Sequence, residues 1–575
     1  MRRPLLLVMA VIVPLTFLSL GHGLPQRYVP DDHSVRCALG IARDLGNPEL
    51  SRLSALVPPS GQYTTYPYLL AYLDLAAVAV VYVGGRLAGA WAGAGAFGEA
   101  VFADPTLAWL PARAIVALLS LLLPLAAYRA GRRLGLDRRG AALAALLGGS
   151  SLLMVHGAHV ERPWAPVAAF TAVTLAASLR LRRRRRVRDV VLAFLPAGLA
   201  TATHPIGVLA FGLPALAALL WRPKLPALLA GPAAGLLLAV LVGYPYLLVY
   251  QQDTGRGAIA GQLEATEVVD IGGQAFSLSS FHGRVLGRTL RGWFGYEPVL
   301  LALGLLGLPA LARAARGRGA SLLVVPPLFL AVLFLAYDGT HVRYLMPATA
   351  FLALSGAAVL QRLAGAGGAG RLAAAALVAV PLLQAARFDL VLGRTDTRTL
   401  AALELPAVIP PGERVAIDGY APPLRPTAAS VDAIDELVWT TRTEVRALDL
   451  ARAGVPEPAD ARDLIPVGRF WRFDSYYAGD YELGAPKELG AWMDEWAIRW
   501  YVQVDRLPDD ERRRPVTELT ARRGRLVTAR SPALDGVSLP SEALLPAEML
   551  FPLTELWRTA RPGPLIRCWR IEDGP

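Results

Sequence analysis

Long apolar runs constrain the fold of this chain more than any other feature. Several of them approach the roughly 20 residues that an α-helix needs to cross a bilayer. The hydrophobic fraction of the 575 residues is 54% and the charged fraction only 18%, which is too little polar surface for a soluble protein of this size. The sequence therefore predicts a mainly α-helical, polytopic membrane protein with room for more than one domain.

About eleven transmembrane helices are expected from these runs. They lie at residues 5–24, 109–130, 140–156, 165–180, 190–203, 205–221, 225–247, 295–312, 321–337, 344–360 and 371–390. The beginning of the chain, two arginines followed by an apolar run, resembles a signal peptide, but it lacks a clear small-residue cleavage site and more spans follow. We therefore expect the first run to be a retained anchor helix.

Arginine-rich connectors between the runs predict the orientation. Because positive loops stay in the cytoplasm, these connectors are expected there. They are GRRLGLDRR (131–139), LRLRRRRRVRD (179–189), WRPK (221–224) and ARAARGRG (312–319). Their clustering accounts for the net charge of +12, so we expect membrane lipids as partners and no nucleic acid.

One segment, 66–91, decides the orientation of everything after it. It is apolar enough to cross the membrane, but a full crossing would place GRRLGLDRR and the arginine run 182–186 outside. That arrangement violates the positive-inside rule at every later connector. We therefore interpret 66–91 as a juxtamembrane or re-entrant helix in a protein of the bacterial inner membrane.

A second domain is expected where the long apolar runs stop, near residue 394. The segments RVAIDGY, IRWYVQVD, GRLVTAR and IRCWRIED are typical of strands, and ELGAWMDEWA is typical of a helix. The sequence thus predicts a transmembrane domain at 1–393 with an outer loop at 25–108, and a soluble extracytoplasmic α/β domain at 394–575. Cys37 and Cys568 could form a disulfide, but two free thiols are favoured.

The outer loop contains the acidic pair Asp31-Asp32, which follows Pro30. Either aspartate could cap the helix that begins there, where negative charge suits the helix dipole. Alternatively, one carboxylate could act as a general base on an acceptor hydroxyl just above the membrane.

Polar residues at the other outer turns also allow two interpretations each. Tyr66, in TTYPYLLAYL, suits an aromatic interface belt or a cradle for a lipid chain. The sequence DGTHVRYLMP places His341, Arg343 and Tyr344 at the end of a span, either as an interfacial anchor or as a phosphate site.

Two further turns contain histidines. His156, His159 and Glu161 lie in MVHGAHVERPWAP, and His204 lies in GLATATHPIG. Their spacing does not match a zinc motif, so polar turns are the simplest interpretation. We expect neither a metal ion nor another cofactor.

The ordered set of motifs resembles a known family. The set comprises an N-terminal span, the PDD loop, a Tyr-Pro helix, FADPTLAWLPARAIVALLSLLLPLAAYRAGRRLGL (102–136), HGAH, RYLMP, DTRTLAALELPAVIPPGERVAIDGYAPPL (396–424) and RPGPLIRCWRI (561–571). It is similar to bacterial membrane glycosyltransferases of the GT-C class, in the protein O-mannosyltransferase and aminoarabinose-transferase superfamily. The resemblance covers most of the chain and implies a GT-C-like transmembrane domain.

The resemblance also implies roles for individual residues. Asp31 would be the catalytic base with Asp32 beside it, Tyr66 would begin the family's Tyr-Pro helix, and Arg343-Tyr344 would meet the donor phosphate. The chain departs from the family pattern in the second outer turn, where Gly157 and Trp164 stand in place of acids. His204 stands where a lysine is common, and Glu161 is offset from the position of the missing acid.

A transfer reaction follows from this resemblance. The donor would be a polyprenyl-phosphate sugar, whose anomeric carbon an extracytoplasmic acceptor hydroxyl would attack with inversion. Arg343, with Arg36 or His341, would stabilise the departing phosphate. Two alternatives remain: a non-catalytic relative of the GT-C class, or a lipid or glycan transporter, although transporters tend to show charged spans and inverted repeats.

Overall fold

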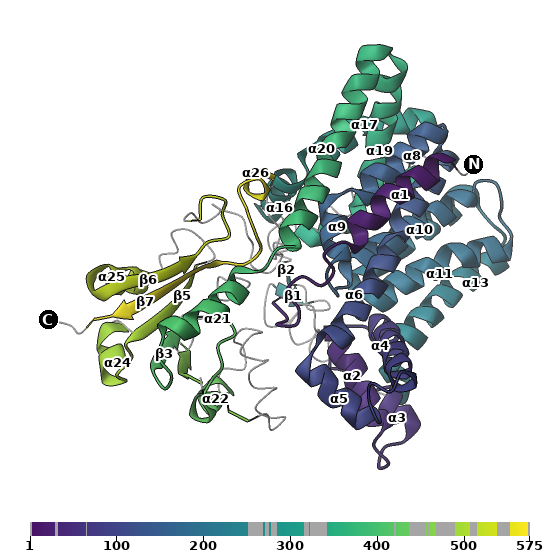
Figure 1. The fold of residues 1–575 in the computed structure, drawn as a ribbon. Helices are drawn as coiled ribbons and strands as arrows, with labels where there is room; N and C mark the ends of the chain where they lie inside the picture. The colour runs from purple at the N-terminus through teal and green to yellow at the C-terminus, as the bar shows by residue number, and fades with distance from the viewer. Residues whose placement is uncertain are drawn as a thin grey trace. The chain divides into compact units, whose positions relative to one another are not determined.

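The structure of the protein is a computed structural model (Figure 1). It describes residues 3–28, 33–64, 66–250, 268–270, 275–277, 284–315, 321–322, 342–418, 421–435, 456–457, 459, 461–466, 489–505, 514–536 and 553–572. The chain forms two compact units. The first comprises Met1–Leu20, Asp31–Val83 and Ala108–Ala386, and the second comprises Gly21–Pro30, Gly84–Leu107 and Arg387–Pro575.

The first unit is helical. In chain order its main elements are α1 (Arg3–Phe17), α2 (His33–Leu45), α3 (Arg52–Leu56), α4 (Leu69–Leu87), α6 (Thr106–Ser120), α7 (Leu122–Leu134), α8 (Arg138–Gly149), α9 (Leu152–Ala158), α10 (Trp164–Arg180) and α11 (Val187–Thr203). They continue with η1 (Pro205–Phe211), α12 (Gly212–Trp221), α13 (Leu225–Leu238), the π-helix η2 (Ala239–Gly243), α14 (Tyr246–Val249), α16 (Arg284–Tyr296), α17 (Pro298–Ala315), η4 (Val342–Ala348), α19 (Thr349–Gly365) and α20 (Gly368–Leu392). A short antiparallel pair, β1 (Val268–Asp270) and β2 (Ala275–Ser277), also belongs to it.

The prediction of a mainly helical, multi-pass membrane protein is confirmed in this general form. Among the described residues, five helices are long and apolar enough to cross a membrane, or up to seven if each of two bent helix pairs is one span. The count of about eleven therefore stays a prediction, and the expected span at 321–337 falls largely outside the described residues. Helix α4 is one of the five by length and composition, so whether 66–91 crosses also stays a prediction.

The first predicted span is shorter than expected. The apolar run suggested 5–24, but helix α1 ends at Phe17 and the chain continues in turns. Gly21, Gly23 and Pro25 follow, and these residues oppose a helix because glycine loses backbone entropy in it and proline removes a donor.

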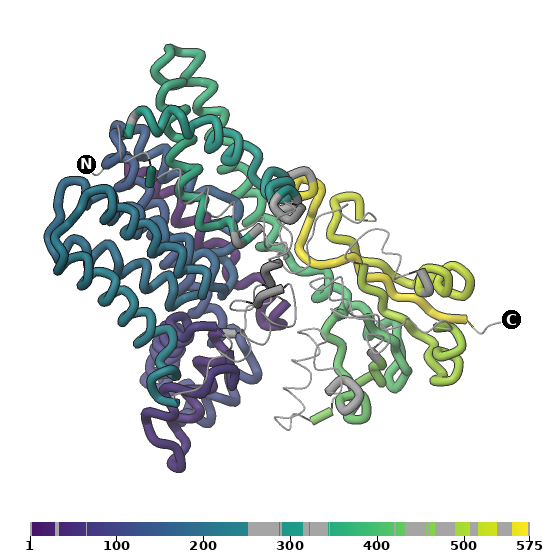
Figure 2. The backbone as a smooth tube through the Cα atoms, turned by 180° about the vertical axis from the view of Figure 1, so that it is seen from behind, coloured from purple at the N-terminus to yellow at the C-terminus, as the bar shows by residue number. Residues whose placement is uncertain are grey.

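Helices α11 and α13 lie side by side (Figure 1 and Figure 2). Their backbones touch, since a Cβ added to Gly198 would lie 2.3 Å from the carbonyl oxygen of Gly235. Small residues allow this close approach between helices in membranes.

Tyrosine hydroxyls fix the segment before helix α4. Tyr72 donates to Leu56 O at 3.1 Å, Tyr250 to Val57 O at 2.7 Å and Tyr68 to Pro58 O at 2.9 Å. These three bonds satisfy consecutive backbone carbonyls. These bonds restrain the backbone that leads into the residues just before α4, which include Tyr66.

The second unit is built on a five-stranded sheet in the order β4-β3-β5-β7-β6 (Figure 1). The strands are β3 (Arg414–Ile417), β4 (Asp463–Pro466), β5 (Trp500–Asp505), β6 (Gly524–Arg530) and β7 (Leu565–Ile571), and the helices include α5 (Ala94–Ala103), α21 (Thr397–Val408), α22 (Ala428–Asp435), α24 (Leu489–Glu495), α25 (Arg514–Arg523) and α26 (Leu553–Leu556). Strand β3 is parallel to β4 and β5, whereas β7 is antiparallel to β5 and β6. All four predicted strands and the predicted helix at 488–497 are confirmed; the side of the membrane on which this unit lies stays a prediction.

Successive side chains of each strand point to opposite faces of the sheet, so the core of this unit has two layers, one on each face. Val415 and Ile417 pack with Leu405 of α21, whereas Ala416 packs with Met493 of α24 and Val516 of α25. Helices thus cover both faces of the sheet.

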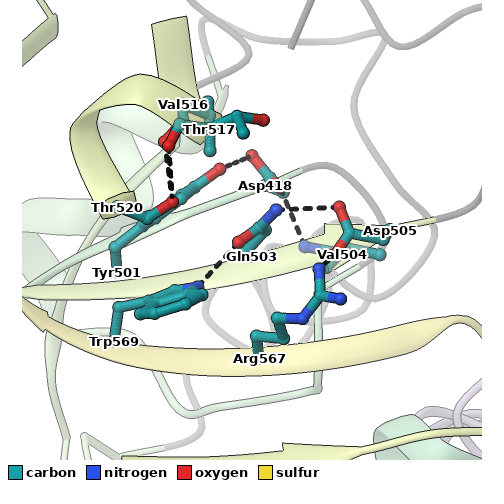
Figure 3. A network of polar contacts seen from close by, with 10 residues as sticks. All are labelled: Asp418, Tyr501, Gln503, Val504, Asp505, Val516, Thr517, Thr520, Arg567 and Trp569. Atoms are coloured by element: carbon teal, nitrogen blue, oxygen red, sulfur yellow. Dashed lines mark hydrogen bonds and ion pairs between the residues drawn. The ribbon is translucent and has the colours of Figure 1, made fainter. Parts of the chain in front are cut away.

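A polar network closes the carboxyl ends of β3 and β5 (Figure 3). The buried carboxylate of Asp418 accepts hydrogen bonds from the Tyr501 hydroxyl at 2.7 Å and from Val504 N at 2.8 Å. Three further contacts extend the network: Gln503 to Asp505, Trp569 to Gln503, and Arg567 to Asp505. These hydrogen bonds tie the strands to one another.

Both cysteines are free and buried, as the sequence favoured. Burial raises the pKa of the Cys37 thiol to about 12, with a contribution from the charge of Asp74, and raises that of Cys568 to about 12. At neutral pH the two residues therefore behave as packing groups rather than nucleophiles.

Candidate functional site

Part of the predicted site lies outside the described residues. This holds for Asp31, Asp32 and His341, so their roles stay predictions. Of Tyr344 the structure gives the backbone, within the 3-10 helix η4. Arg36 lies on the exposed side of α2.

Four residues from separate turns of the first unit meet in one place. The guanidinium carbon of Arg343 lies 5.3 Å from the centre of the Trp164 ring, and the His204 ring lies 4.4 Å from the same indole. The Tyr66 ring lies 5.4 Å from His204. We call Tyr66, Trp164, His204 and Arg343 the aromatic–basic cluster. The structure thus brings together three residues that the sequence had singled out.

Each residue of the aromatic–basic cluster is placed by the end of a helix. Trp164 is the first residue of α10, and Arg343 is the second residue of η4. His204 is the N-cap of η1, and Tyr66 lies just before α4, with its backbone N–H bonded to Thr64 Oγ1 at 3.0 Å. Because helix N-termini carry partial positive charge, the end of α10 adds to the positive potential at this place.

The hydrogen bonding of His204 defines its tautomer. Its Nδ1 accepts from the backbone N–H of Ile206 at 3.2 Å, so Nδ1 carries no proton and the neutral ring carries its proton on Nε2. The side chain is therefore a neutral N–H donor within the cluster.

Among the four residues of the cluster, Arg343 carries the formal positive charge. Arg343 is half-buried, and its charge acts on both His156 and His204. A half-buried guanidinium beside an imidazole N–H and a phenol is suited to a phosphate or another oxyanion, because charge-assisted hydrogen bonds are stronger away from bulk water.

Packing leaves little room for a side chain at Gly157. A Cβ at this position would lie 3.0 Å from Ala165 Cβ and 2.7 Å from Met346 Cε. Met346 is the fifth residue of η4, the helix that also contains Arg343. The glycine therefore allows α9, α10 and η4 to approach closely.

Trp164, the second residue that differs from the family pattern, also has a structural role. Its ring contacts Arg343 on one hand and His204 on the other. An aromatic ring holds a guanidinium through a cation–π interaction without neutralising its charge. The indole of Trp164 therefore helps to hold Arg343 in the cluster.

His159 and Glu161, which the sequence placed at the same predicted turn, are both buried. The Nδ1 atom of His159 lies 2.7 Å from Val155 O, and its Nε2 atom lies close to Leu18 O after α1. Within the described part of the chain, no group of three His, Cys, Asp or Glu residues is placed to hold a metal ion.

Glu297 was not singled out by the sequence patterns. Its carboxylate connects the break between α8 and α9 to the break at Glu297 itself. It accepts hydrogen bonds from Leu153 N at 3.0 Å, from Trp293 Nε1 at 3.0 Å and from the hydroxyl of Ser151. Helices α8 and α9 are bent by 58° at Ser151, and the pair around Glu297 by 116°. The available clue was an isolated acid directly before a proline and an apolar run, which is a costly position unless the acid is paired.

Comparisons with known proteins give structural likeness only. No protein family and no curated protein matches the sequence. The fold is similar to ArnT from Cupriavidus metallidurans bound to undecaprenyl phosphate, with 15% identity, a TM-score of 0.43, and coverage of 87% of this chain and 92% of that one. It is also similar to the oligosaccharyltransferase AglB from Archaeoglobus fulgidus in complex with an inhibitory peptide and a dolichol-phosphate, with 13% identity, a TM-score of 0.42, and coverage of 92% and 74%. At these scores the likeness does not define a function for this chain.

Proposed function

We propose that the protein is a membrane glycosyltransferase that moves a sugar from a polyprenyl-phosphate donor to an extracytoplasmic acceptor with inversion. The observation that carries the proposal is the aromatic–basic cluster, in which Arg343 stacks on Trp164 beside His204. A lipid phosphate needs a cationic, partly dry site at the end of apolar helices, and the cluster has these properties. The resemblance of the sequence motifs to GT-C enzymes points to the same chemistry.

In the proposed reaction the acceptor hydroxyl oxygen attacks the anomeric carbon. Its bond to carbon forms as the bond from carbon to the phosphate oxygen breaks, so polyprenyl phosphate leaves with the bonding electron pair. Asp31 takes the hydroxyl proton. The leaving phosphate is already acidic, so Arg343 and the N–H of His204 stabilise its charge and no general acid is required.

Alignment is the second contribution of the protein. The lipid tail holds the donor at the membrane surface, and the cluster fixes its phosphate. An acceptor bound on the outer side then meets the sugar at a defined angle, which turns a bimolecular step into one with a high effective concentration. The sugar, hexosyl or pentosyl, and the acceptor class, protein, lipid or polysaccharide, are left open.

Binding of polyprenyl phosphate to the purified protein in nanodiscs tests the proposal. Replacing Arg343 by leucine removes the main cation, so we expect affinity to fall about 10- to 100-fold, as for loss of a charged hydrogen-bonding partner. Arg184→Leu, in an exposed arginine run predicted on the other side, is the matched control and should bind normally. Equal affinity for both variants would contradict the phosphate site, and normal binding without sugar transfer would favour a non-catalytic relative or a transporter.

A further inference from the structure

One glycine of the first unit contacts both of the segments that contain Tyr66 and His204. Gly243 is the last residue of the π-helix η2, which follows α13 directly and closes the apolar helix Leu225–Gly243. A π-helix is rare and occurs mostly as a single turn, frequently at a functional site. The place of η2 beside the aromatic–basic cluster points to a role in that site.

The carbonyl of Gly243 holds the start of α4. It accepts a hydrogen bond from Tyr68 N at 2.9 Å. Tyr68 directly precedes α4 and is 1% exposed, and the N–H groups at a helix start have no partner within the helix, so a buried one needs a partner elsewhere. The carbonyl is available to Tyr68 because the helix breaks here: Pro245 lacks an N–H, and Leu247 N begins the next turn by donating to Tyr244 O at 3.1 Å.

The Cα atom of Gly243 lies against the last turn of α11. A Cβ added at this position would lie 2.5 Å from Ala202 Cα and 3.2 Å from Ala202 O, and these are backbone atoms in a close-packed interior. The next residue, Tyr244, donates from its hydroxyl to Thr201 O at 3.3 Å. The end of η2 therefore packs directly on the backbone that leads to His204, the N-cap of η1.

Two positions along the chain separate each of these contacts from the cluster. Tyr68 follows Tyr66 by two, and Ala202 precedes His204 by two. Two residues span at most about 7 Å. His204 N donates to Ala200 O at 3.1 Å, so α11 keeps its hydrogen bonding up to the cluster. The glycine thus sets the distance between the two segments, which place the Tyr66 ring 5.4 Å from the His204 ring.

We propose that Gly243 is a positioning residue: through the end of the π-helix it sets the separation of Tyr66 and His204, and with it the width of the site that receives the phosphate. A side chain at position 243 would push the end of α11 away from the backbone that holds the start of α4. The inference rests on the proposed function for the identity of the ligand. The separation of the two side chains is a property of the fold and can be measured without a ligand.

Fluorine NMR of the full-length protein in nanodiscs tests the separation directly. A fluorotyrosine at position 66 has a chemical shift that depends on the nearby His204 ring. In Gly243→Ala this signal should move, because the added Cβ forces Ala202 and the residues after it to shift. An unmoved signal in folded Gly243→Ala would overturn the inference.

Gly307→Ala is the matched control. Its Cβ would lie 2.0 Å from Ser355 O, which is an equally tight backbone contact, but between α17 and α19. This variant should lower the thermal midpoint at least as much as Gly243→Ala and leave the fluorine signal in place. A signal that moves equally in both variants would reduce the effect to general loss of packing and overturn the inference.

Binding of polyprenyl phosphate tests the consequence for the site. We expect Gly243→Ala to lose affinity about 3- to 30-fold, because a widened site weakens the hydrogen bonds to the charged phosphate. Gly307→Ala should bind like the wild type. A moved fluorine signal with unchanged affinity would overturn the positioning role.

Tyr244→Phe provides the test if Gly243→Ala does not fold. It removes only the hydroxyl that bonds Thr201 O, so we expect a smaller change of the same kind in the fluorine signal and in the affinity. Wild-type behaviour in both measurements would overturn the inference. If the wild-type protein does not bind polyprenyl phosphate, the proposed function fails, and the fluorine comparison still decides whether Gly243 sets the separation.

Discussion

The guanidinium of Arg343 stacks on the indole of Trp164, with 5.3 Å between the Arg343 Cζ atom and the ring centre. In the family pattern that the sequence resembles, an acid occupies the position of Trp164. In this chain the guanidinium lies against an aromatic ring at that position. Gly157, the other departure from the pattern, lies close to Met346 of η4, the helix that also contains Arg343.

Replacing Trp164 by leucine should weaken donor binding. Cation–π interactions contribute about 0.5–2 kcal/mol, so we expect the donor KM to rise roughly 2- to 30-fold, with a smaller rise in Trp164→Phe. Steady-state kinetics with varied polyprenyl-phosphate sugar measure this. Trp557, which lies 6.0 Å from Arg387 in the second unit, offers a similar Arg–Trp pair as a control. A donor KM that changes equally in Trp164→Leu and Trp557→Leu would contradict the assignment.

Adding a methyl group at Gly157 should destabilise the first unit. Ala165 Cβ would lie 3.0 Å from the new atom and, unlike the flexible end of Met346, has nowhere to move. Overpacking of this kind costs about 1–3 kcal/mol, so the thermal midpoint of Gly157→Ala in detergent should fall by several degrees. At Gly212 no atom lies within 4 Å of an added Cβ, and Gly212→Ala should keep the wild-type midpoint. If the two variants unfold alike, crowding does not explain the glycine.

Removing the carboxylate of Glu297 should destabilise the unit more strongly. Ser151, Leu153 and Trp293 would each lose the acceptor of a buried hydrogen bond, and each unsatisfied group costs about 1–3 kcal/mol. We expect Glu297→Ala to lose about 3 kcal/mol or more of unfolding free energy and Ser151→Ala about 1 kcal/mol. Thermal or denaturant unfolding in detergent gives the comparison. Equal stability of Glu297→Ala and the wild type would show that the carboxylate does not join the helix breaks.

Local sequence patterns predicted the elements of the second unit well. RVAIDGY and GRLVTAR contain the residues that β-strands favour and are bounded by turns, so strands β3 and β5 to β7 were expected at nearly their observed places. The order of the strands was not predictable in this way, because pairing depends on contacts between distant segments. The same holds for the contact between the Arg398 guanidinium and the Tyr28 ring, which lie 3.9 Å apart although the two residues are far apart in the sequence.

The candidate site was predicted in part. Tyr66, His204 and Arg343 were expected at outer turns, and the structure brings them together. His159 turned out to bind backbone carbonyls, which periodicity and charge alone do not reveal. Trp164 was noted only as a missing acid, because its contact with Arg343 depends on how α10 and η4 pack.

Sugar transfer by Asp31→Asn tests the central claim most directly. Membranes that contain the protein are supplied with a radiolabelled polyprenyl-phosphate sugar, and label in the acceptor fraction is measured. Asp104→Asn, the same change at an exposed position of the predicted outer loop, is the control. We predict transfer by the wild type and by Asp104→Asn, and a loss of about 10²- to 10⁴-fold in Asp31→Asn, the range for loss of a general base. Undiminished transfer by Asp31→Asn, or no transfer by the wild type from any polyprenyl-phosphate donor, would contradict the account.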